Sequence, residues 1–308
     1  MKIFVFMGGS SSEKNISIKT GNAIIASLSR KYEVKPLNVS FHNNDISFLE
    51  EIQKGDIVFN ALHGGSGENG DIQSVLDMKG VSYTGSGSKA SKICMDKHFS
   101  KLIAQMEGLK VPDWVLYKDS NVNNQKMFNV KEERFSYPYI IKPNSEGSTM
   151  GLAKIDNKDQ VDSAISAALE FSSEIMIEEY ISGREITVGI LGNKALPIVE
   201  IFPQKDLFDY ECKYSKGMSN YVVPAEINKE LASKIQSDAI RIHESIGCKH
   251  YSRVDFMLDD DGNYYFLEIN SLPGMTSTSL LPMAAKSAGV DFDNLIDIIL
   301  NMAILDND

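Results

Sequence analysis

Two neighbouring segments near the C-terminus carry the side chains best suited to chemistry. Arg253 and Asp255 lie in one predicted strand, and Glu268 and Asn270 lie in the next. Because side chains alternate between the two faces of a strand, residues two apart share a face. If the faces coincide, three oxygen ligands and an arginine meet across about 5 Å of paired strands. This pattern predicts a magnesium site whose arginine stabilises developing negative charge; the alternative is a solvated cross-strand salt bridge.

A second candidate site begins at Lys142. This lysine ends an apolar strand just before residues 146–151, which are rich in glycine and hydroxyl groups. A lysine there supplies a point charge for phosphate, and the loop supplies backbone and hydroxyl donors. The alternative is an ordinary surface lysine before a turn. The loop does not match a P-loop, and Gly85-Ser86-Gly87 does not match the dinucleotide fingerprint, so both of those nucleotide folds are disfavoured.

A third segment could recognise the base and sugar of a nucleotide. Glu178, Glu179 and Ile181 lie at the end of a predicted strand, and Glu185 follows a Ser-Gly turn. Backbone carbonyls and amides at 178–181 could read an adenine edge, with Glu185 placed for ribose hydroxyls. A solvated acidic turn is the alternative.

The elements that position these residues begin with a doubly wound α/β unit over about the first ninety residues. Apolar runs bounded by glycine predict buried parallel strands, and each is followed by a glycine-rich loop and a helix. In such units ligands bind at the carboxyl ends of the strands, where both glycine-rich loops lie. The predicted strands are 2–7, 32–39 and 56–62, and the predicted helices are 16–28 and 72–78.

The remaining residues predict α+β structure. Gly192-Asn193 and Asp259-Asp260-Asp261-Gly262 each indicate a hairpin turn. Residues 204–221 show no period and are expected to form a mobile functional loop. The predicted strands are 137–142, 174–180, 185–191, 195–202, 251–258 and 264–269, and the predicted helices are 91–107, 158–169, 225–246 and 293–300.

Composition restricts the kinds of partner. The net charge is −11, from 42 acidic and 31 basic residues, and no segment gathers basic side chains, so nucleic acid is not an expected partner. No apolar run reaches the roughly 18–20 residues that span a bilayer, so no membrane contact is expected. The first residues resemble a buried strand rather than a signal peptide. Three widely spaced cysteines suggest reduced thiols in a cytoplasmic protein.

Taken together, the motifs resemble those of D-alanine–D-alanine ligases, which have the ATP-grasp fold, and they follow the family order along all 308 residues. The resemblance implies a doubly wound domain (1–93), a central ATP-grasp subdomain (94–183) and a C-terminal subdomain with the metal and substrate site (184–308). The matching segments are Gly8-Gly9-Ser10-x-x-Glu13, His63-Gly64-x-x-Gly67-Glu68-x-Gly70, Tyr83-Thr84-Gly85-Ser86-Gly87, Met95-Asp96-Lys97, Lys142-Pro143-x-x-Glu146-Gly147-Ser148, Lys213-Tyr214 and Pro273-Gly274-Met275-Thr276-x-x-Ser279-Leu280.

The resemblance also implies the reaction. ATP phosphorylates the carboxylate of a first D-alanine, and the amine of a second attacks the acyl phosphate to give D-alanyl-D-alanine for peptidoglycan precursors. Two Mg²⁺ ions (or Mn²⁺) and a homodimer are expected on the same basis. The implied roles are Glu13 for the first ammonium and His63 near its carboxylate; Ser148 and Tyr214 in a hydrogen-bonded triad with Glu13; Lys213, Ser279 and Leu280 for the second carboxylate; Arg253 and Gly274 for the oxyanion; Lys97 and Lys142 for phosphates; and Asp255, Glu268 and Asn270 for metal.

Two other functions stay open at this stage. A D-alanine–D-lactate ligase is one, although Tyr214 favours the dipeptide product because relatives of that type tend to lose this tyrosine. A catalytically silent nucleotide sensor is the other, and the intact Arg253 set argues against it. The sequence departs from the family at Phe208, where tyrosine is frequent, and at Glu179, where many relatives carry lysine. No departure removes a proposed ligand.

Overall fold

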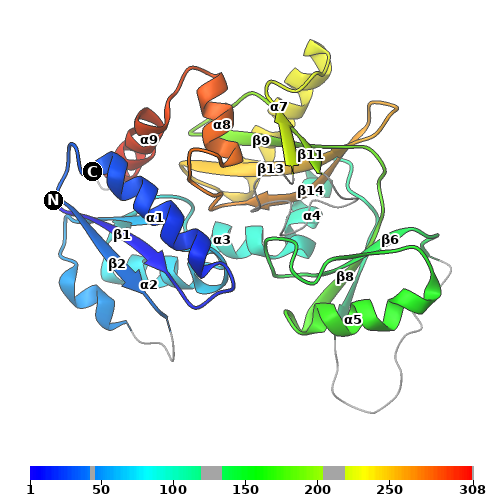
Figure 1. Ribbon diagram of the computed structural model, residues 1–308, viewed down its shortest axis with the longest axis horizontal. Helices are drawn as coiled ribbons and strands as arrows, with labels where there is room; N and C mark the ends of the chain where they lie inside the picture. Colours follow the sequence, from blue (N-terminus) through cyan, green and yellow to red (C-terminus); the bar gives the residue numbers. More distant parts are fainter. Residues whose placement is uncertain (42–45, 119–133, 204–218, 307–308) are drawn as a thin grey trace.

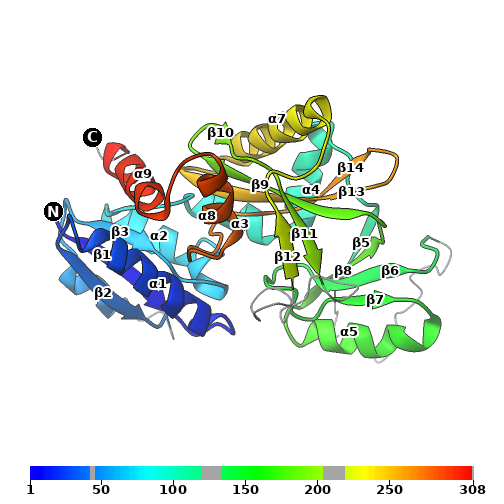
Figure 2. The same cartoon turned by 45° about the horizontal axis from the view of Figure 1, so that its top comes forward.

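The described part of the chain forms three β-sheets with helices packed on them (Figures 1 and 2). The computed structural model describes residues 1–41, 46–118, 134–203 and 219–306.

The N-terminal sheet is parallel and has the order β2-β1-β3-β4. Alternate side chains of β1 serve different cores: Ile3 and Val5 pack with α1 and α9, whereas Phe4 and Phe6 pack with α2. Helices on both faces confirm the predicted doubly wound unit. The elements are β1 (Ile3–Gly8), α1 (Lys14–Leu28), β2 (Val34–Val39), η1 (Ser47–Glu51), β3 (Ile57–Asn60), η2 (Gly65–Gly67), α2 (Asp71–Lys79), β4 (Ser82–Tyr83) and α9 (Phe292–Leu305).

The central sheet is antiparallel and has the order β5-β8-β6-β7. One face is covered by α5, whose Ala164, Ile165 and Ala168 pack on Ile141 and Ile177 (Figure 1). The carboxyl end of β6 therefore delivers Lys142 to the edge of this layer. The elements are β5 (Trp114–Lys118), β6 (Tyr139–Pro143), β7 (Ala153–Ile155), η3 (Lys158–Gln160), α5 (Val161–Leu169) and β8 (Glu174–Glu179).

The largest sheet has the order β12-β11-β9-β13-β14, with β10 paired to β9. One face packs on α3, α4 and α7, and α8 packs on β9 from the other side. At Gly189 a Cβ would lie 2.6 Å from Leu281 Cδ1, so glycine allows the close approach of α8. The elements are α3 (Ser88–Met95), α4 (Lys97–Met106), β9 (Arg184–Leu191), β10 (Lys194–Ala195), β11 (Val199–Pro203), β12 (Ser219–Val222), α7 (Lys229–Ile246), β13 (Tyr251–Leu258), β14 (Tyr264–Asn270) and α8 (Leu280–Ser287).

Several predicted elements need correction. The helix expected over 91–107 is two helices, because Asp96 leaves helical geometry (φ −88°, ψ 101°) and caps α4. The strand expected over 195–202 is divided into β10 and β11, with Pro197, which has no N–H to donate, between them. The helix expected over 225–246 begins only at Lys229, after its cap Asn228. β5, β7 and α8 were not predicted.

Two further predictions are only partly addressed by the described residues. Of the loop expected over 204–221, residues 219–221 belong to β12, and the rest lies outside the described ranges. Across the ranges that are described, no helix is both long and apolar enough to cross a bilayer. The division of the chain at residues 93 and 183 stays a prediction.

Candidate functional site

The β13–β14 hairpin places the four predicted residues on matching positions. Arg253 pairs with Asn270, and Asp255 pairs with Glu268, so the two predicted faces coincide. The Arg253 guanidinium donates to both Asp255 carboxylate oxygens, at 2.9 Å from Nε and 2.8 Å from the terminal nitrogen. Thr187 of the adjacent strand β9 donates its hydroxyl to Asp255 Oδ1. Because a carboxylate has about four acceptor positions, these three bonds orient Asp255 and leave one position for another ligand.

Lys97 extends from the first turn of α4 towards this hairpin. Its Nζ lies 3.3 Å from Glu268 Oε2 and donates to the backbone oxygen of Glu146 at 2.5 Å. The break at Asp96 makes this possible, because it lets α4 start in a new direction. Asp96 also accepts a hydrogen bond from Asn144 Nδ2 at 3.0 Å, which joins the start of α4 to the end of β6.

A buried group of three charges lies behind the loop that follows β6. Glu178 Oε1 accepts from Lys101 at 2.8 Å and from Lys142 at 3.0 Å. Lys101 is fully buried, and this burial lowers its pKa to about 8, although Glu178 opposes the shift. Burial alone would raise the pKa of Glu178, but the two ammonium groups hold it below its usual range. With both lysines protonated, the group carries a net charge of +1.

The hairpin and the loops around it enclose two neighbouring cavities. The first, of about 230 Å³, lies between the N-terminal unit and the hairpin, and the second, of about 140 Å³, lies between the hairpin and the central sheet. Lys97, Glu146, Gly147 and Glu268 line both. A group bound in one cavity therefore faces a group bound in the other across Glu268 and Lys97.

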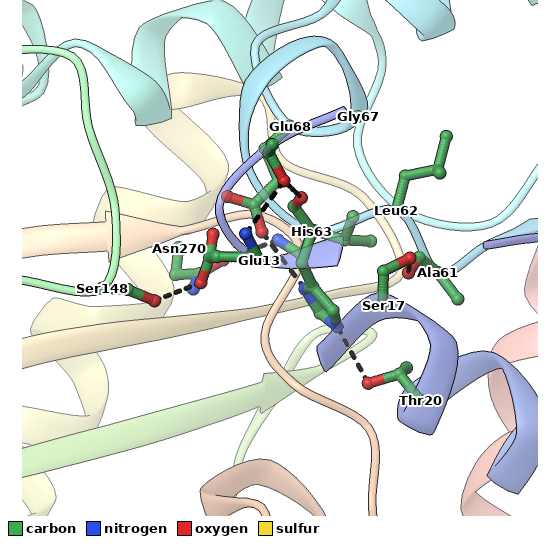
Figure 3. Close-up of polar contacts among 12 residues, drawn as sticks. Glu13, Ser17, Thr20, Ala61, Leu62, His63, Gly67, Glu68, Ser148 and Asn270 are labelled. Atoms are coloured by element: carbon green, nitrogen blue, oxygen red, sulfur yellow. Dashed lines mark hydrogen bonds and ion pairs between the residues drawn. The ribbon is translucent and has the colours of Figure 1, made fainter. Parts of the chain in front are cut away.

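Glu13 joins the N-terminal unit to the loop after β6. It directly precedes α1 and is almost completely buried. Ser148 donates its hydroxyl to Glu13 Oε1, although 135 residues separate them (Figure 3). A Cβ at Gly64 would lie 2.7 Å from Glu13 Oε2, and Gly64 has a φ of +68°, so both space and backbone require glycine there.

His63 lies beside Glu13 with both ring nitrogens engaged. Nε2 is 2.9 Å from Thr20 Oγ1 and Nδ1 is 3.4 Å from Glu68 Oε1 (Figure 3). Burial raises the pKa of Glu68, while the contact with His63 opposes the shift. The ring orientation is thus fixed from two sides, by α1 and by the segment after β3.

The loop after β6 contains backbone strain at Ser148 and Thr149. Their φ angles are +52° and +62°, in a region that residues other than glycine seldom adopt. Such strain persists where the surroundings fix the backbone, and it is frequent in ligand-binding loops. Here it turns the Ser148 hydroxyl towards Glu13.

The second cavity is lined by both polar and apolar residues. Its lining includes Lys142, Glu178, Glu179, Ile181 and Glu185. Glu179 Oε2 accepts from the backbone N–H of Asp113 at 3.3 Å, so its side chain supports the neighbouring segment. Apolar side chains of this kind suit contact with the faces of a flat heterocycle; in this cavity they are Pro112, Ile140, Met150, Leu152, Met257 and Leu267.

The segment before α8 and the first residue of that helix also line the first cavity. They contribute Gly274, Ser279 and Leu280. Ser279 Oγ accepts from the Thr276 N–H at 3.1 Å and lies 2.8 Å from the Thr276 hydroxyl. Leu280 is the first residue of α8, where backbone N–H groups favour an anion.

Most predicted site residues line one or both cavities. Lys213, Tyr214 and the departure at Phe208 lie outside the described residues. Lys101, Glu68 and Thr187 have no role that the sequence patterns predict. Glu68 was in a quoted motif, and Lys101 lies four positions after Lys97 in one helix, which places both lysines on one face and is the signal that could have revealed it.

Comparisons with known proteins give one consistent result. The family model described as "D-ala D-ala ligase C-terminus" matches residues 103–301, and that described as "D-ala D-ala ligase N-terminus" matches residues 38–86. The chain is 39% identical to the D-alanine–D-alanine ligase of Halalkalibacterium halodurans, covering 99% of each, and 40% identical to that of Aquifex aeolicus, covering 97% of this chain and 100% of the relative.

Solved structures agree. The D-alanine–D-alanine ligase from Bacillus anthracis, also solved in complex with ATP, superposes with a TM-score of 0.84 at 37% identity, covering 100% of this chain and 98% of the other. VanG D-Ala:D-Ser ligase from Enterococcus faecalis has the same TM-score at 28% identity, covering 98% and 99%.

Proposed function

This chain belongs to the D-alanine–D-alanine ligase family, and from that membership we propose a role for each of its two cavities. The protein has the ATP-grasp fold and is an ATP-dependent ligase that joins two D-alanines for cell-wall synthesis. The observation that carries our assignment is the wall that the two cavities share. Because the cavities adjoin at this wall, the terminal phosphate of an ATP bound in the second cavity would lie next to the carboxylate of a D-alanine bound in the first.

The second cavity binds ATP. The apolar residues hold the adenine, with backbone groups from Glu179 to Ile181 at its edge and Glu185 at the ribose. Lys142 and Lys97 contact the phosphates. The Lys101–Glu178–Lys142 group supports this role, because its net positive charge favours a polyanion and its ion pairs hold the Lys142 ammonium in place.

The first cavity binds the two D-alanines. Glu13 accepts the ammonium of the first, and His63 lies beside its carboxylate. Ser279, the Leu280 amide and Lys213 bind the carboxylate of the second. Tyr214 completes a triad with Ser148 and Glu13. The Ser148–Glu13 hydrogen bond supports the triad. The roles of Lys213 and Tyr214 rest on the family resemblance, because both residues lie outside the described ranges.

Asp255, Glu268 and Asn270 fit two magnesium ions by their chemistry. They supply oxygen ligands from two alternate residue pairs on one face of the hairpin, and Asp255 keeps an acceptor position. Among the described residues no three His, Cys, Asp or Glu side chains cluster as a metal site, so the amide of Asn270 is needed to complete the set. When bound, the ions neutralise phosphate charge and orient the phosphoryl group.

The side chains of this site then act in two steps. In the first, Lys97 and Lys142 lower the repulsion between the D-alanine carboxylate and the γ-phosphate, so that a carboxylate oxygen attacks the γ-phosphorus, ADP leaves and an acyl phosphate forms. In the second, the neutral amine of the other D-alanine attacks the acyl carbon, inorganic phosphate leaves as the acyl C–O bond breaks, and the nitrogen loses a proton to give the peptide. Arg253 and the Gly274 N–H stabilise the oxyanion that forms there.

The product is tested by measuring phosphate release with ATP, a magnesium salt and a panel of D-alanine, L-alanine, D-serine and D-lactate. Of the four compounds supplied singly, we expect only D-alanine to support phosphate release. We expect mass spectrometry to detect D-alanyl-D-alanine in that reaction. A mixture with D-lactate should still give mainly the dipeptide at neutral pH. No phosphate release would favour a silent nucleotide sensor, and a dominant ester would favour a D-alanine–D-lactate ligase.

We also propose that the protein is a cytoplasmic homodimer. Within each chain, we place the boundaries between the three domains near residues 93 and 183. The use of ATP and D-alanine supports the location, and family resemblance supports the dimer and the division. Light scattering of the purified protein tests the dimer, since a mass near 34.1 kDa would contradict it.

A further inference from the structure

Two cysteines that are far apart in the sequence meet beside the first cavity. Cys94 lies in the last turn of α3, and Cys248 follows Gly247, which ends α7. Their sulfur atoms are 3.4 Å apart and share a hydrogen bond. Both side chains are buried and are free thiols. The function described above makes no use of either.

The pair is close enough to form a bond. A disulfide requires sulfur atoms about 2.05 Å apart, so each sulfur needs to move by less than about 1 Å. Both cysteines lie at helix ends, where small shifts break few backbone hydrogen bonds. We propose that Cys94 and Cys248 form a reversible oxidation site that a peroxide converts to an intramolecular disulfide, slowing the ligase.

The two sulfurs have different roles in this reaction. The hydrogen bond from Cys94 lowers the pKa of Cys248, while the pKa of Cys94 is raised by the same hydrogen bond and by burial. The Cys248 thiolate attacks hydrogen peroxide, and water leaves after protonation, which gives a sulfenic acid. The Cys94 thiol then attacks that sulfur and a second water leaves. Overall, two thiols and one peroxide give a disulfide and two waters.

Access for the oxidant comes from the first cavity. Cys94 lines that cavity together with Met95, and the Cys248 sulfur lies 3.4 Å from the Cys94 sulfur. A molecule as small as hydrogen peroxide that enters the cavity therefore reaches the edge of the cysteine pair.

The disulfide would change the position of Lys97. Lys97 lies three residues after Cys94 in the chain, just beyond the helix break at Asp96, and it contacts Glu268 and Glu146 in the shared wall. A shift of Cys94 towards Cys248 pulls on this segment. Because displacements of about 1 Å in a catalytic site reduce rates strongly, we expect turnover to fall about tenfold or more.

The test uses the full chain with Cys212→Ser, so that Cys94 and Cys248 are the remaining cysteines. The protein is treated with hydrogen peroxide, quenched with catalase, alkylated and digested. We expect mass spectrometry to find the peptides of Cys94 and Cys248 linked. Phosphate release with D-alanine should fall about tenfold or more in proportion to the link, and dithiothreitol should restore it.

The matched control adds Cys248→Ser, which cannot form the link. It should keep its turnover through the same peroxide treatment, and it retains all 13 methionines, so it reports any loss due to their oxidation. The proposal is overturned by the absence of linked peptide, by full turnover in a cross-linked sample, or by an equal loss in the control. The peptide readout does not depend on the ligase activity.

Discussion

Glu268 is a carboxylate that faces both cavities and lies 3.3 Å from Lys97. Glu268→Gln keeps the size of the side chain and removes its charge. Because that charge would be shared between the metal ions at the transferred phosphoryl group, we expect kcat to fall by about a hundredfold or more. Phosphate release at saturating ATP and D-alanine measures it.

Glu244→Gln serves as the control for this change, because Glu244 is exposed on α7, away from both cavities. It should leave kcat unchanged. Near-normal turnover in Glu268→Gln would show that Glu268 is not a ligand of the metal ions.

Lys101 leads to a prediction about pH. Its pKa of about 8 means that a rise in pH through 8 neutralises the ammonium, and the charge of the Lys101–Glu178–Lys142 group falls from +1 to 0. ATP binding should weaken as a result. We expect kcat/KM for ATP to decline above about pH 8, a change that belongs to the coupled group rather than to one residue.

Lys101→Met should remove that decline, because the charge is already absent. At pH 7 its kcat/KM for ATP should be roughly tenfold lower, equivalent to about 1.4 kcal/mol. Lys92→Met, at an exposed position on α3, should show the wild-type profile. If kcat/KM for ATP fell equally above about pH 8 in Lys101→Met, the decline would belong to another titrating group.

At the scale of elements, the junction between α3 and α4 depends on Asp96. Its carboxylate accepts from the Phe99 N–H at 3.1 Å and from Asn144 Nδ2 at 3.0 Å. Asp96→Ala should lower the free energy of unfolding by about 1 kcal/mol and also raise the KM for ATP, because Lys97 follows directly. Urea denaturation and steady-state kinetics measure the two effects.

Asn228 provides the comparison, because it caps α7 by accepting from the Leu231 N–H at 2.8 Å and lies outside both cavities. Asn228→Ala should cost a similar free energy of unfolding with no change in KM. If both variants change only stability, the junction does not position Lys97.

Elements with a clear period and a clear turn could be predicted from the sequence. The hairpin at 251–258 and 264–269 alternates and turns at Asp-Gly, and its site followed from the same alternation. The break at Asp96 could not be predicted, because apolar spacing continues through it. The interruption at Pro197 was missed although the sequence signals it, because a proline has no N–H to donate within a sheet.

Contacts between distant segments could not be read from spacing. The contacts of Ser148 with Glu13 and of Lys101 with Glu178 depend on how the sheets pack. No local sequence pattern specifies that packing. Resemblance to a family supplied the first pair but not the second.

At the scale of the molecule, the shared wall predicts coupled binding. A nucleotide in the second cavity would order Lys97, Glu146 and Glu268, which also line the first. We expect a non-hydrolysable ATP analogue with magnesium to tighten D-alanine binding by about fivefold or more, and D-alanine to tighten the analogue by the same factor. Calorimetric titrations in both orders measure this, and equal affinities with and without the analogue would contradict it.

The place of α9 has a consequence for biosynthesis. This last helix packs against α1 and the N-terminal sheet, where Leu295, Ile299 and Leu300 join the core of Ile3, Val5 and Phe59 (Figure 2). Until α9 has been translated, the emerging N-terminal segment has α1 but not α9 on this face of its sheet, so part of the apolar face stays open. The N-terminal sheet therefore completes this core only after residues 292–305 have left the ribosome.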